Sequence, residues 1–443
     1  MTHEQDKLVV EPGGRLNGTL RIPGDKSISH RAVMLGAIAE GTTEIDGFLD
    51  SADCTATIGA FRRLGVEIDG PQARHVTVHG KGLHGLRASS APLELGNSGT
   101  SMRLLAGLLA GQAFGSVLRG DASLSYRPMR RIVDPLTAMG ADIRPTSTGT
   151  APLVIAPSRG LHGIHYDMPV SSAQVKSSLL LAGLYASGET RVTDPGRSRD
   201  HTERMLRAFG VRVQAHDATV AIVGPSRLRA TRVGVPADIS SAAFFIVGAA
   251  ITPGSDLLLP GVGINPTRTG ILTILRNMGA RIETENAREE AGEPVADLRV
   301  RGLDGLHGTD IEPELVTLAI DEMPIVFVAA ACADGETTIR GAAELRVKES
   351  DRISAMCSGL VTLGIDAIES ADGATIRGGS LRGGSVEAAG DHRVAMAFAI
   401  AGLRSAGTVR IRGCENIRTS FPDFAATARR AGLAVRAEGA AVA

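Results

Sequence analysis

The feature that most constrains the fold is a pair of helix types, each followed by a β-rich segment, that recurs six times along the chain. Helices of the first type are apolar and end at glycines 66 to 81 residues apart, namely Gly41, Gly115, Gly188, Gly254, Gly335 and Gly407. Helices of the second type are amphipathic and end at glycines 68 to 85 residues apart, namely Gly65, Gly140, Gly210, Gly279, Gly364 and Gly432. A glycine just past a helix is a common left-handed stop. Two independent signals of one period predict six copies of a single α/β unit of about 70 residues.

The two helix types predict how each unit is layered. First-type helices such as those over 178–184, 242–251 and 325–331 have few polar positions, so they must be buried on all sides. Second-type helices keep a charged face, for example at Arg204 and Arg207, and belong outside. We therefore predict an α/β protein of two inside-out α/β barrel domains. Each would hold three repeated β-α-β-α-β-β units with buried helices.

The repeat also predicts the domain boundaries. The third and fourth units are separated near residues 235–238, and an N-terminal strand over 8–20 precedes the first unit. We expect this strand to pair with the second group of three units. Residues 1–22 and 239–443 would then form one discontinuous domain, into which residues 23–238 are inserted.

Composition narrows the class of protein. A net charge of −1 over 443 residues argues against general attraction to nucleic acid or membranes, and 3% aromatic residues with no Trp argue against a base-stacking surface. The cysteines, Cys54, Cys332, Cys357 and Cys414, are widely spaced and are expected to be buried thiols in a reducing compartment. Residues 1–7 are polar without an apolar signal core. We expect a cytoplasmic monomer with no nucleic-acid or membrane partner.

The stretch PGDKSISHR at residues 23–31 combines a turn with the start of an apolar helix. Helix N-termini leave N–H groups unpaired and carry partial positive charge. Lys26, Ser27 and Arg31 add an ammonium, a hydroxyl and a guanidinium to that end, which suits a phosphate or carboxylate. The alternative for this stretch alone is a helix cap followed by solvated basic residues.

The same design recurs at other helix starts, which favours the anion-binding interpretation. Polar and cationic groups begin the other first-type helices at Asn97–Gly99 with Arg103, Ser171–Gln174 with Lys176, Asp238–Ser241, Asp321–Glu322 and Asp391–Arg393. Second-type helices are expected to begin near Arg127, Arg199 and the pair Lys348 and Arg352, which at i,i+4 would share one helix face. Lys and Arg are rarely buried unless paired. The chain is nearly neutral overall, so cations gathered at these positions predict a focused positive cleft for small, highly charged anions.

Two carboxylates in these runs are candidates for proton transfer. Asp321 begins a strongly apolar helix, where a helix cap would account for it with roughly 1 kcal/mol. As a base among cations it would instead accept a proton from a substrate hydroxyl. Glu349, between Lys348 and Arg352, has the same two interpretations. The histidines are scattered and no G-x-x-x-x-G-K-[ST] loop is present, so we expect no metal site and no nucleotide cofactor.

Nine stretches in one order along the chain resemble the EPSP synthase family, the 3-phosphoshikimate 1-carboxyvinyltransferases. They are PGDKSISHRA (23–32), GNSGTSMRLL (96–105), GDASLSYRPMRRIVDPLTAMGA (120–141), SSAQVKSSLLLAGL (171–184), RDHTERML (199–206), DEMP (321–324), ELRVKESDRI (344–353), GDHRVAMAFAI (390–400) and SFPDF (420–424). Glu344, Ala173 and the Thr419-Ser420 pair, which stands where many members have a lysine, are similar to the divergent second bacterial class. The resemblance implies two inside-out α/β domains with the active site in the cleft between them.

The resemblance also implies a reaction on the chorismate branch of aromatic amino acid biosynthesis. Phosphoenolpyruvate would donate its enolpyruvyl group to the 5-hydroxyl of shikimate 3-phosphate by addition–elimination, giving 5-enolpyruvylshikimate 3-phosphate and phosphate. By the family pattern, shikimate 3-phosphate would be bound by Lys26, Ser27, Arg31, Ser172, Gln174, Arg199, Asp321 and Lys348. Phosphoenolpyruvate would be bound by Lys26, Gly99, Arg127, Gln174, Arg352 and Arg393. Asp321 would take the hydroxyl proton, and Glu349, with Lys26, would protonate the methylene carbon; no cofactor or metal is implied.

Two alternatives remain at this point. The sister enolpyruvyl transferase acting on UDP-N-acetylglucosamine has a similar fold but uses a Cys on a loop of its N-terminal part, and the comparable loop here, residues 119–123, has none. A non-catalytic anion-binding relative would have no need of Asp321 and Glu349.

Overall fold

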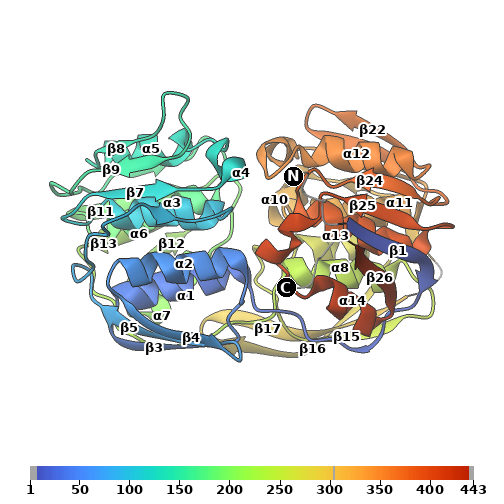
Figure 1. Cartoon of the computed structure of the whole chain (residues 1–443), viewed down its shortest axis with the longest axis horizontal. Coiled ribbons are helices and arrows are strands. Elements are labelled where there is room, and N and C mark those ends of the chain that lie inside the picture. The colour runs from blue at the N-terminus through green and yellow to red at the C-terminus, as the bar shows by residue number, and fades with distance from the viewer. Residues whose placement is uncertain (1–6, 303–304, 439–443) are drawn as a thin grey trace. The chain divides into compact units, whose positions relative to one another are not determined.

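The computed structural model describes residues 7–302 and 305–438, which form two compact units (Figure 1). The discontinuous unit contains the described residues up to Pro23, Ala237–Arg288 and those from Pro294 onward. The inserted unit contains Gly24–Pro236 and the short segment Glu289–Glu293. The grouping of that short segment with the inserted unit was not anticipated, because nothing in its sequence departs from the strands on either side. Residues 1–6, which include most of the polar N-terminal stretch, lie outside the described part.

Three four-stranded sheets of one topology build the inserted unit. In each, an edge strand runs parallel to a central strand, and two antiparallel strands follow. The first sheet has the order β14 (Arg232–Gly234), β3 (Glu40–Asp46), β5 (His75–Lys81) and β4 (Glu67–Gln72). The second has β6 (Leu93–Glu94), β7 (Ser116–Arg119), β9 (Leu153–Ile155) and β8 (Ile143–Arg144). The third has β10 (His165–Asp167), β11 (Gly188–Thr193), β13 (Thr219–Gly224) and β12 (Val213–His216).

The discontinuous unit repeats this topology three times. Its first sheet has the order β2 (Asn17–Thr19), β15 (Asp256–Gly263), β17 (Glu293–Arg301) and β16 (Arg281–Glu290). The second has β19 (Asp310–Ile311), β21 (Glu336–Ile339), β23 (Gly373–Arg377) and β22 (Asp366–Ser370). The third has β24 (Gly384–Glu387), β25 (Val409–Arg412), β1 (Lys7–Gly14) and β26 (Leu433–Glu438). A short pair, β18 (Leu306–His307) with β20 (Ala333–Asp334), accompanies them.

The N-terminal segment corrects one expectation. The single strand predicted over residues 8–20 is two strands in two sheets: β1 pairs with β25 and β26 (blue beside red in Figure 1), and β2 pairs with β15. β1 ends with Gly13 and Gly14 at φ angles of +85° and +114°, values that residues with a side chain rarely adopt, and β2 begins at Asn17. The expected pairing with the second group of three units is present in both strands.

The helices follow the predicted layering. The helices expected inside are α1 (Lys26–Ile38), α3 (Gly99–Leu109), α6 (Ala173–Gly183), α8 (Ile239–Ala250), α11 (Met323–Ala331) and α13 (His392–Ala401). Every residue of α8 and α11 is buried, as an apolar helix without a polar face requires. The helices with a polar face are α2 (Ala52–Arg63), α5 (Arg130–Ala138), α7 (His201–Ala208), α9 (Gly270–Asn277), α12 (Arg352–Thr362) and α14 (Phe424–Ala431). Shorter helices are α4 (Ala122–Ser125), α10 (Pro313–Leu318), and the 3₁₀ turns η1 (Ala343–Val347), η2 (Gly402–Arg404) and η3 (Glu415–Thr419).

Each unit has a hydrophobic core of its own, built around its three inner helices. Of the four cysteines, Cys54, Cys357 and Cys414 are buried as expected, whereas Cys332 is only partly buried. Among the described residues, the helices are all too short or too polar to cross a membrane. The inner helices therefore fix where the candidate site residues lie, because most of these residues stand at or just before a helix start.

Candidate active site

Lys26 is the first residue of inner helix α1. Asp25 caps this helix, with its Oδ1 accepting a hydrogen bond from the N–H of Ile28 at 2.9 Å. The Lys26 ammonium forms an ion pair with Asp53 Oδ2, and its side chain remains partly exposed. The cap and the ion pair hold this ammonium at the positive end of the helix, as the sequence predicted.

Arg31 lies one turn further into α1 and is almost fully buried. Its Nε donates to Thr202 Oγ1 at 2.7 Å, its Nη2 to Ser177 Oγ at 2.8 Å and its Nη1 to the carbonyl of Ser27 at 3.0 Å. Burial lowers the pKa of this guanidinium to about 10, and the nearby positive charge of Arg199 adds to the shift. A guanidinium held by hydroxyls and a carbonyl keeps its charge available for an anion.

The start of α3 brings a second pair of guanidiniums together. A Cβ atom at Gly99 would lie 3.0 Å from Arg103 Nη1 and 3.2 Å from Arg127 Nη1, so only glycine leaves both groups where they are. Arg103 Nη1 donates to Gln174 Oε1 at 2.6 Å, and Arg127 Nη2 contacts Asn97 Oδ1 at 2.5 Å. Arg127 stands between α4 and α5, so it is a linker residue and not the start of an outer helix as expected.

Gln174 and Ser172 extend this cluster to the start of α6. Ser172 caps α6 by accepting from the N–H of Val175 at 3.4 Å, and Gln174 Nε2 donates to Thr100 Oγ1 at 3.0 Å. The predicted residues of the inserted unit lie at or near the starts of α1, α3 and α6 and in the segments before α5 and α7, and we refer to them together as the cationic cluster. Its members are Lys26, Ser27, Arg31, Gly99, Arg127, Ser172, Gln174 and Arg199.

Lys176 does not belong to the cationic cluster, although its place in the sequence suggested an anion-binding role. Its Nζ lies 2.9 Å from Glu203 Oε1 and 3.3 Å from Asp194 Oδ2, and it donates to the carbonyl of Ser198 at 2.9 Å. All three charged side chains are buried. The two carboxylates therefore account for this ammonium without a ligand.

Asp194 also orders the chain on both sides of α6. It accepts hydrogen bonds from Ser171 Oγ at 2.6 Å, from the N–H of Ser198 at 2.8 Å and from the N–H of Gly196 at 3.3 Å. Burial opposes its negative charge, but Lys176 and these donors outweigh burial and lower the pKa of Asp194. The segments that carry Ser172 and Arg199 are thus tied to one buried carboxylate, which the sequence did not reveal.

In the discontinuous unit, Arg352 is the centre of an ionic network. Its Nε donates to Asp391 Oδ2 at 2.8 Å, its Nη2 to Glu349 Oε2 at 2.6 Å, and its Nη1 lies 3.4 Å from Asp321 Oδ1. Burial disfavours the charge, but Asp391, Glu349 and Asp321 together raise the pKa of Arg352. Both predicted catalytic carboxylates therefore share one buried guanidinium.

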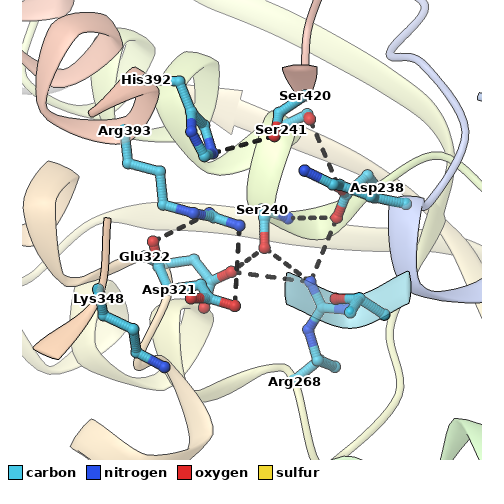
Figure 2. Close-up of polar contacts among 12 residues, drawn as sticks. Asp238, Ser240, Ser241, Arg268, Asp321, Glu322, Lys348, His392, Arg393 and Ser420 are labelled. Carbon is cyan, nitrogen blue, oxygen red and sulfur yellow. Dashed lines mark hydrogen bonds and ion pairs between the residues drawn. The ribbon is translucent and has the colours of Figure 1, made fainter. Parts of the chain in front are cut away.

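Asp321 is held at two points by Arg393 (Figure 2). Arg393 Nη1 donates to the main-chain carbonyl of Asp321 at 3.0 Å, and Arg393 Nη2 lies 3.7 Å from Asp321 Oδ2. Asp321 is not the cap of α11: the cap position belongs to Glu322. The helix-cap explanation of Asp321 is therefore wrong, and its carboxylate remains partly exposed between two arginines.

Lys348 and Arg352 do not share a helix face. Lys348 follows the 3₁₀ turn η1, and α12 begins only at Arg352 after the cap Asp351. Burial lowers the pKa of Lys348, against the attraction of Asp321 and Glu344. The two cations still meet the same carboxylates, so the predicted residues of this unit form a second cluster, the acid–base cluster: Asp321, Lys348, Glu349, Arg352 and Arg393.

Three further residues carry part of these networks and were missed. Asp391 was seen only as part of a polar helix start, yet it is the main partner of Arg352. Glu322 and Arg268 lie buried close to Ser240, and no spacing pattern in the sequence relates the three. Among the described residues, no group of His, Cys, Asp and Glu has an arrangement that could hold a metal ion.

Comparison with known proteins identifies the class to which this fold and these clusters belong. The enolpyruvyl transferase NikO of Streptomyces tendae has the same fold, with a TM-score of 0.79 at 20% identity over 99% of this chain and 100% of that one. The EPSP synthase of Acinetobacter baumannii is similar with a TM-score of 0.89 at 52% identity, covering 98% of this chain and all of the other. The fold is therefore that of the enolpyruvyl transferases, with two inside-out α/β units.

Sequence comparison narrows the class to one family. The profile of EPSP synthase (3-phosphoshikimate 1-carboxyvinyltransferase) matches residues 10–427. The 3-phosphoshikimate 1-carboxyvinyltransferase of Methylococcus capsulatus is 61% identical over 97% of this chain and 99% of its own length, and that of Nitrosococcus oceani is 61% identical over 97% and 96%. The chain belongs to the EPSP synthase family. It is a transferase of the shikimate pathway, in aromatic amino acid biosynthesis.

Proposed function

We propose that the cationic cluster and the acid–base cluster bind one substrate pair, phosphoenolpyruvate and shikimate 3-phosphate. Two phosphates and two carboxylates must be held side by side against their mutual repulsion, which requires several fixed cations. The observation that carries the proposal is Asp321: a partly exposed carboxylate, one residue before the cap position of α11, between two arginines and close to a lysine.

Shikimate 3-phosphate is assigned to residues of both clusters. Its phosphate and hydroxyls would be bound by Lys26, Ser27, Arg31, Ser172, Gln174, Arg199, Asp321 and Lys348. Arg31 supports this assignment because it donates its hydrogen bonds to two hydroxyls and a carbonyl, and none of the ion pairs among the described residues neutralises its charge. The Asp194 network supports the assignment by ordering the segments of Ser172 and Arg199.

Phosphoenolpyruvate is assigned to Lys26, Gly99, Arg127, Gln174, Arg352 and Arg393. Planar guanidiniums suit both its carboxylate and its phosphate because they can donate two parallel hydrogen bonds. The absence of a side chain at Gly99 keeps open the space beside Arg127. These residues come from both units, so each unit would supply part of the binding site.

The proposed reaction has two stages. In the addition, the 5-hydroxyl oxygen bonds to C2 of phosphoenolpyruvate, its proton passes to Asp321, and Glu349, with Lys26, delivers a proton to C3, which becomes a methyl group. In the elimination, C3 returns a proton, the C2–O bond to phosphate breaks, and inorganic phosphate leaves with the enolpyruvyl product. Arg352 would position Glu349, since the two groups are 2.6 Å apart.

The test is phosphate release from shikimate 3-phosphate plus phosphoenolpyruvate by the parent chain, Asp321→Ala and the control Glu314→Ala, which changes an exposed carboxylate of α10 in the same unit. We expect turnover by the parent and the control and near loss in Asp321→Ala. Turnover of Asp321→Ala at the parental rate would remove Asp321 from the mechanism. If the parent releases no phosphate with shikimate 3-phosphate, the proposed activity is contradicted, and release with UDP-N-acetylglucosamine instead would favour the sister transferase.

A further inference from the structure

A buried polar cluster adjoins Asp321 and has no role in the mechanism above (Figure 2). Ser240 Oγ donates to Glu322 Oε1, and Arg268 Nη2 donates to Ser240 Oγ at 2.7 Å and to Asp238 Oδ1 at 3.2 Å. Arg268 Nη2 also lies 3.8 Å from Glu322 Oε1. We call Asp238, Ser240, Arg268 and Glu322 the anchor cluster. Glu322 and Arg268 are 1% and 3% exposed, among the most buried charged side chains of this unit.

Stability alone is a weak reason for such a cluster. Removing charged groups from water costs several kcal/mol per ion, and the attraction between buried partners often does no more than offset that cost. Glu322 gains little in return, because its Oε2 has no hydrogen-bond partner within the described part of the chain. Buried charges that are costly to keep point to a requirement for a fixed geometry.

The anchor cluster joins three segments of the discontinuous unit. Asp238 and Ser240 are at the start of α8, directly after the chain enters the discontinuous unit at Ala237. Arg268 comes from the segment before α9, where its own N–H donates to the carbonyl of Asn265 at 2.8 Å. Glu322 is the residue after Asp321 and the cap of α11, and its side chain turns to Ser240 instead of making a capping bond among the described residues.

The main chain at Asp321 is therefore held from two sides. Arg393 holds the Asp321 carbonyl at 3.0 Å, and the next side chain along, that of Glu322, is tied to Ser240 and Arg268. We propose that Glu322 is a positioning residue for Asp321: with Ser240 and Arg268 it fixes the peptide that carries the reacting carboxylate. This inference depends on the proposed role of Asp321 as the base.

The consequence concerns turnover more than binding. Without the anchor, the peptide after Asp321 can shift, and a misplacement of about 1 Å at a reacting group can cost on the order of a hundredfold in rate. Arg352 and Lys26, which are assigned to substrate binding, are held by other partners, Asp391 and Asp53. Asp321 and Arg393 contribute to binding as well, so loss of Glu322 should lower kcat much more than it raises either KM value.

The experiment measures kcat, both KM values and the free energy of unfolding for Glu322→Ala, Glu322→Gln and the exposed control Glu314→Ala. For Glu322→Ala we expect kcat at least tenfold lower, with both KM values within about threefold of the parent. Glu322→Gln keeps an oxygen that can accept from Ser240, so it should retain more of kcat than the alanine variant. An unchanged kcat in folded Glu322→Ala, or an effect on KM alone, would overturn the proposal.

Two further variants keep the test decisive. Ser240→Ala removes the hydroxyl between Glu322 and Arg268 without leaving an unpaired charge of its own, so it serves if Glu322→Ala does not fold. We expect Ser240→Ala to lower kcat, and combining it with Glu322→Gln should cost less than the two separate losses multiplied, because both act through one contact. Independent, multiplicative losses would overturn the anchor. If Asp321→Ala itself keeps full turnover, Asp321 is not the base and the role of Glu322 fails with it, whereas the proposed activity fails only if the parent chain releases no phosphate.

Discussion

Replacing Lys176 by methionine removes an ammonium that lies 2.9 Å from Glu203 and 3.3 Å from Asp194 in the interior of the inserted unit. Methionine fills a similar volume, so the main effect is electrostatic. Removing one partner of a buried ion pair costs 3–5 kcal/mol, roughly, because the remaining charge is left uncompensated. Two carboxylates lose their partner here, and all three side chains are at most 6% exposed. We therefore expect a loss of about 4 kcal/mol in the free energy of unfolding of this unit.

Urea unfolding followed by circular dichroism measures this loss, since the chain has no Trp for fluorescence. Each unit has its own core, so the curve is to be fitted with one transition per unit. The matched control is Lys81→Met, the same substitution at an exposed position of the same unit, which should change stability by about 0.5 kcal/mol at most. A loss below about 1 kcal/mol in Lys176→Met would refute the buried network, because such a value is typical of exposed ion pairs.

The stability difference between the parent and Lys176→Met should depend on pH. The pKa of Asp194 is lowered in the folded chain, so its contribution is present above the ordinary value of 3.8 and is lost as the pH falls through the folded value. Despite burial, the pKa of Lys176 is raised by Glu203 and Asp194, so its contribution is present below 10.5 and is lost as the pH rises through the folded value. The difference between parent and Lys176→Met should thus be largest near neutral pH and should narrow on acidification. A difference that grows towards acid pH would contradict this reasoning.

Three further outcomes follow from individual contacts. Gly99→Ala places a methyl group 3.0 Å from a guanidinium nitrogen of Arg103 and 3.2 Å from one of Arg127, so KM for phosphoenolpyruvate should rise severalfold while KM for shikimate 3-phosphate stays constant. Steady-state kinetics with each substrate varied in turn measures both values, and an unchanged KM for phosphoenolpyruvate would show that the contact is irrelevant. Burial lowers the pKa of Lys348, so KM for shikimate 3-phosphate should rise as the pH rises through that lowered value. In Lys348→Arg the side chain stays charged and this rise in KM at alkaline pH should disappear; a rise that persists would belong to another group. Asp391→Asn removes the main charged partner of Arg352, although asparagine can still cap α13, so the free energy of unfolding should fall by about 2 kcal/mol and kcat/KM should also fall. Thermal or urea unfolding and steady-state kinetics measure both effects, and full activity would mean that Glu349 and Asp321 hold Arg352 by themselves.

The layered architecture was predictable because it depends on period and on hydrophobic pattern, which are local properties of the chain. The glycines after the six outer helices all have positive φ and mark six units, and the absence of a polar face on α8 and α11 requires burial. In the other set, Gly115 and Gly407 lie several residues beyond α3 and α13 without a positive φ, so they are not the predicted left-handed stops. The path of the N-terminal segment was less predictable. Its two strands pair with β25 and β15, far along the chain, and β1 ends at two glycines with positive φ angles, Gly13 and Gly14.

The relation between Lys348 and Arg352 shows why a spacing rule fails at a helix boundary. The i,i+4 argument holds only inside a helix. Here Asp351 caps α12 by accepting from the N–H of Ser354 at 3.1 Å, so the helix begins at Arg352 and Lys348 is left outside. Asp351 is a strong capping residue in the sequence, and giving it that role would have placed the boundary correctly.

The sequence can show that a cation lies at a buried helix start, but the neighbouring residues determine whether its charge is balanced within the protein or is available for an anionic ligand. Lys176 and Arg31 looked equivalent, yet Lys176 is balanced by Asp194 and Glu203, whereas Arg31 meets hydroxyls and a carbonyl. These partners are distant in the sequence from the cations they meet, so no local pattern separates the two cases.

Arg352 is both balanced by carboxylates and assigned to a substrate, which has a chemical consequence for the proposed reaction. Three carboxylates share its charge, and Asp321 is the weakest partner of the three at 3.4 Å. When Asp321 accepts the hydroxyl proton in the addition it becomes neutral, so its attraction for Arg352 is already weaker when negative charge shifts onto the departing phosphate in the elimination. The guanidinium can then attract that charge without moving far, since Asp391 still fixes its position through Nε. The carboxylate that makes the proton transfer possible would thus also regulate how strongly the neighbouring cation stabilises the leaving group.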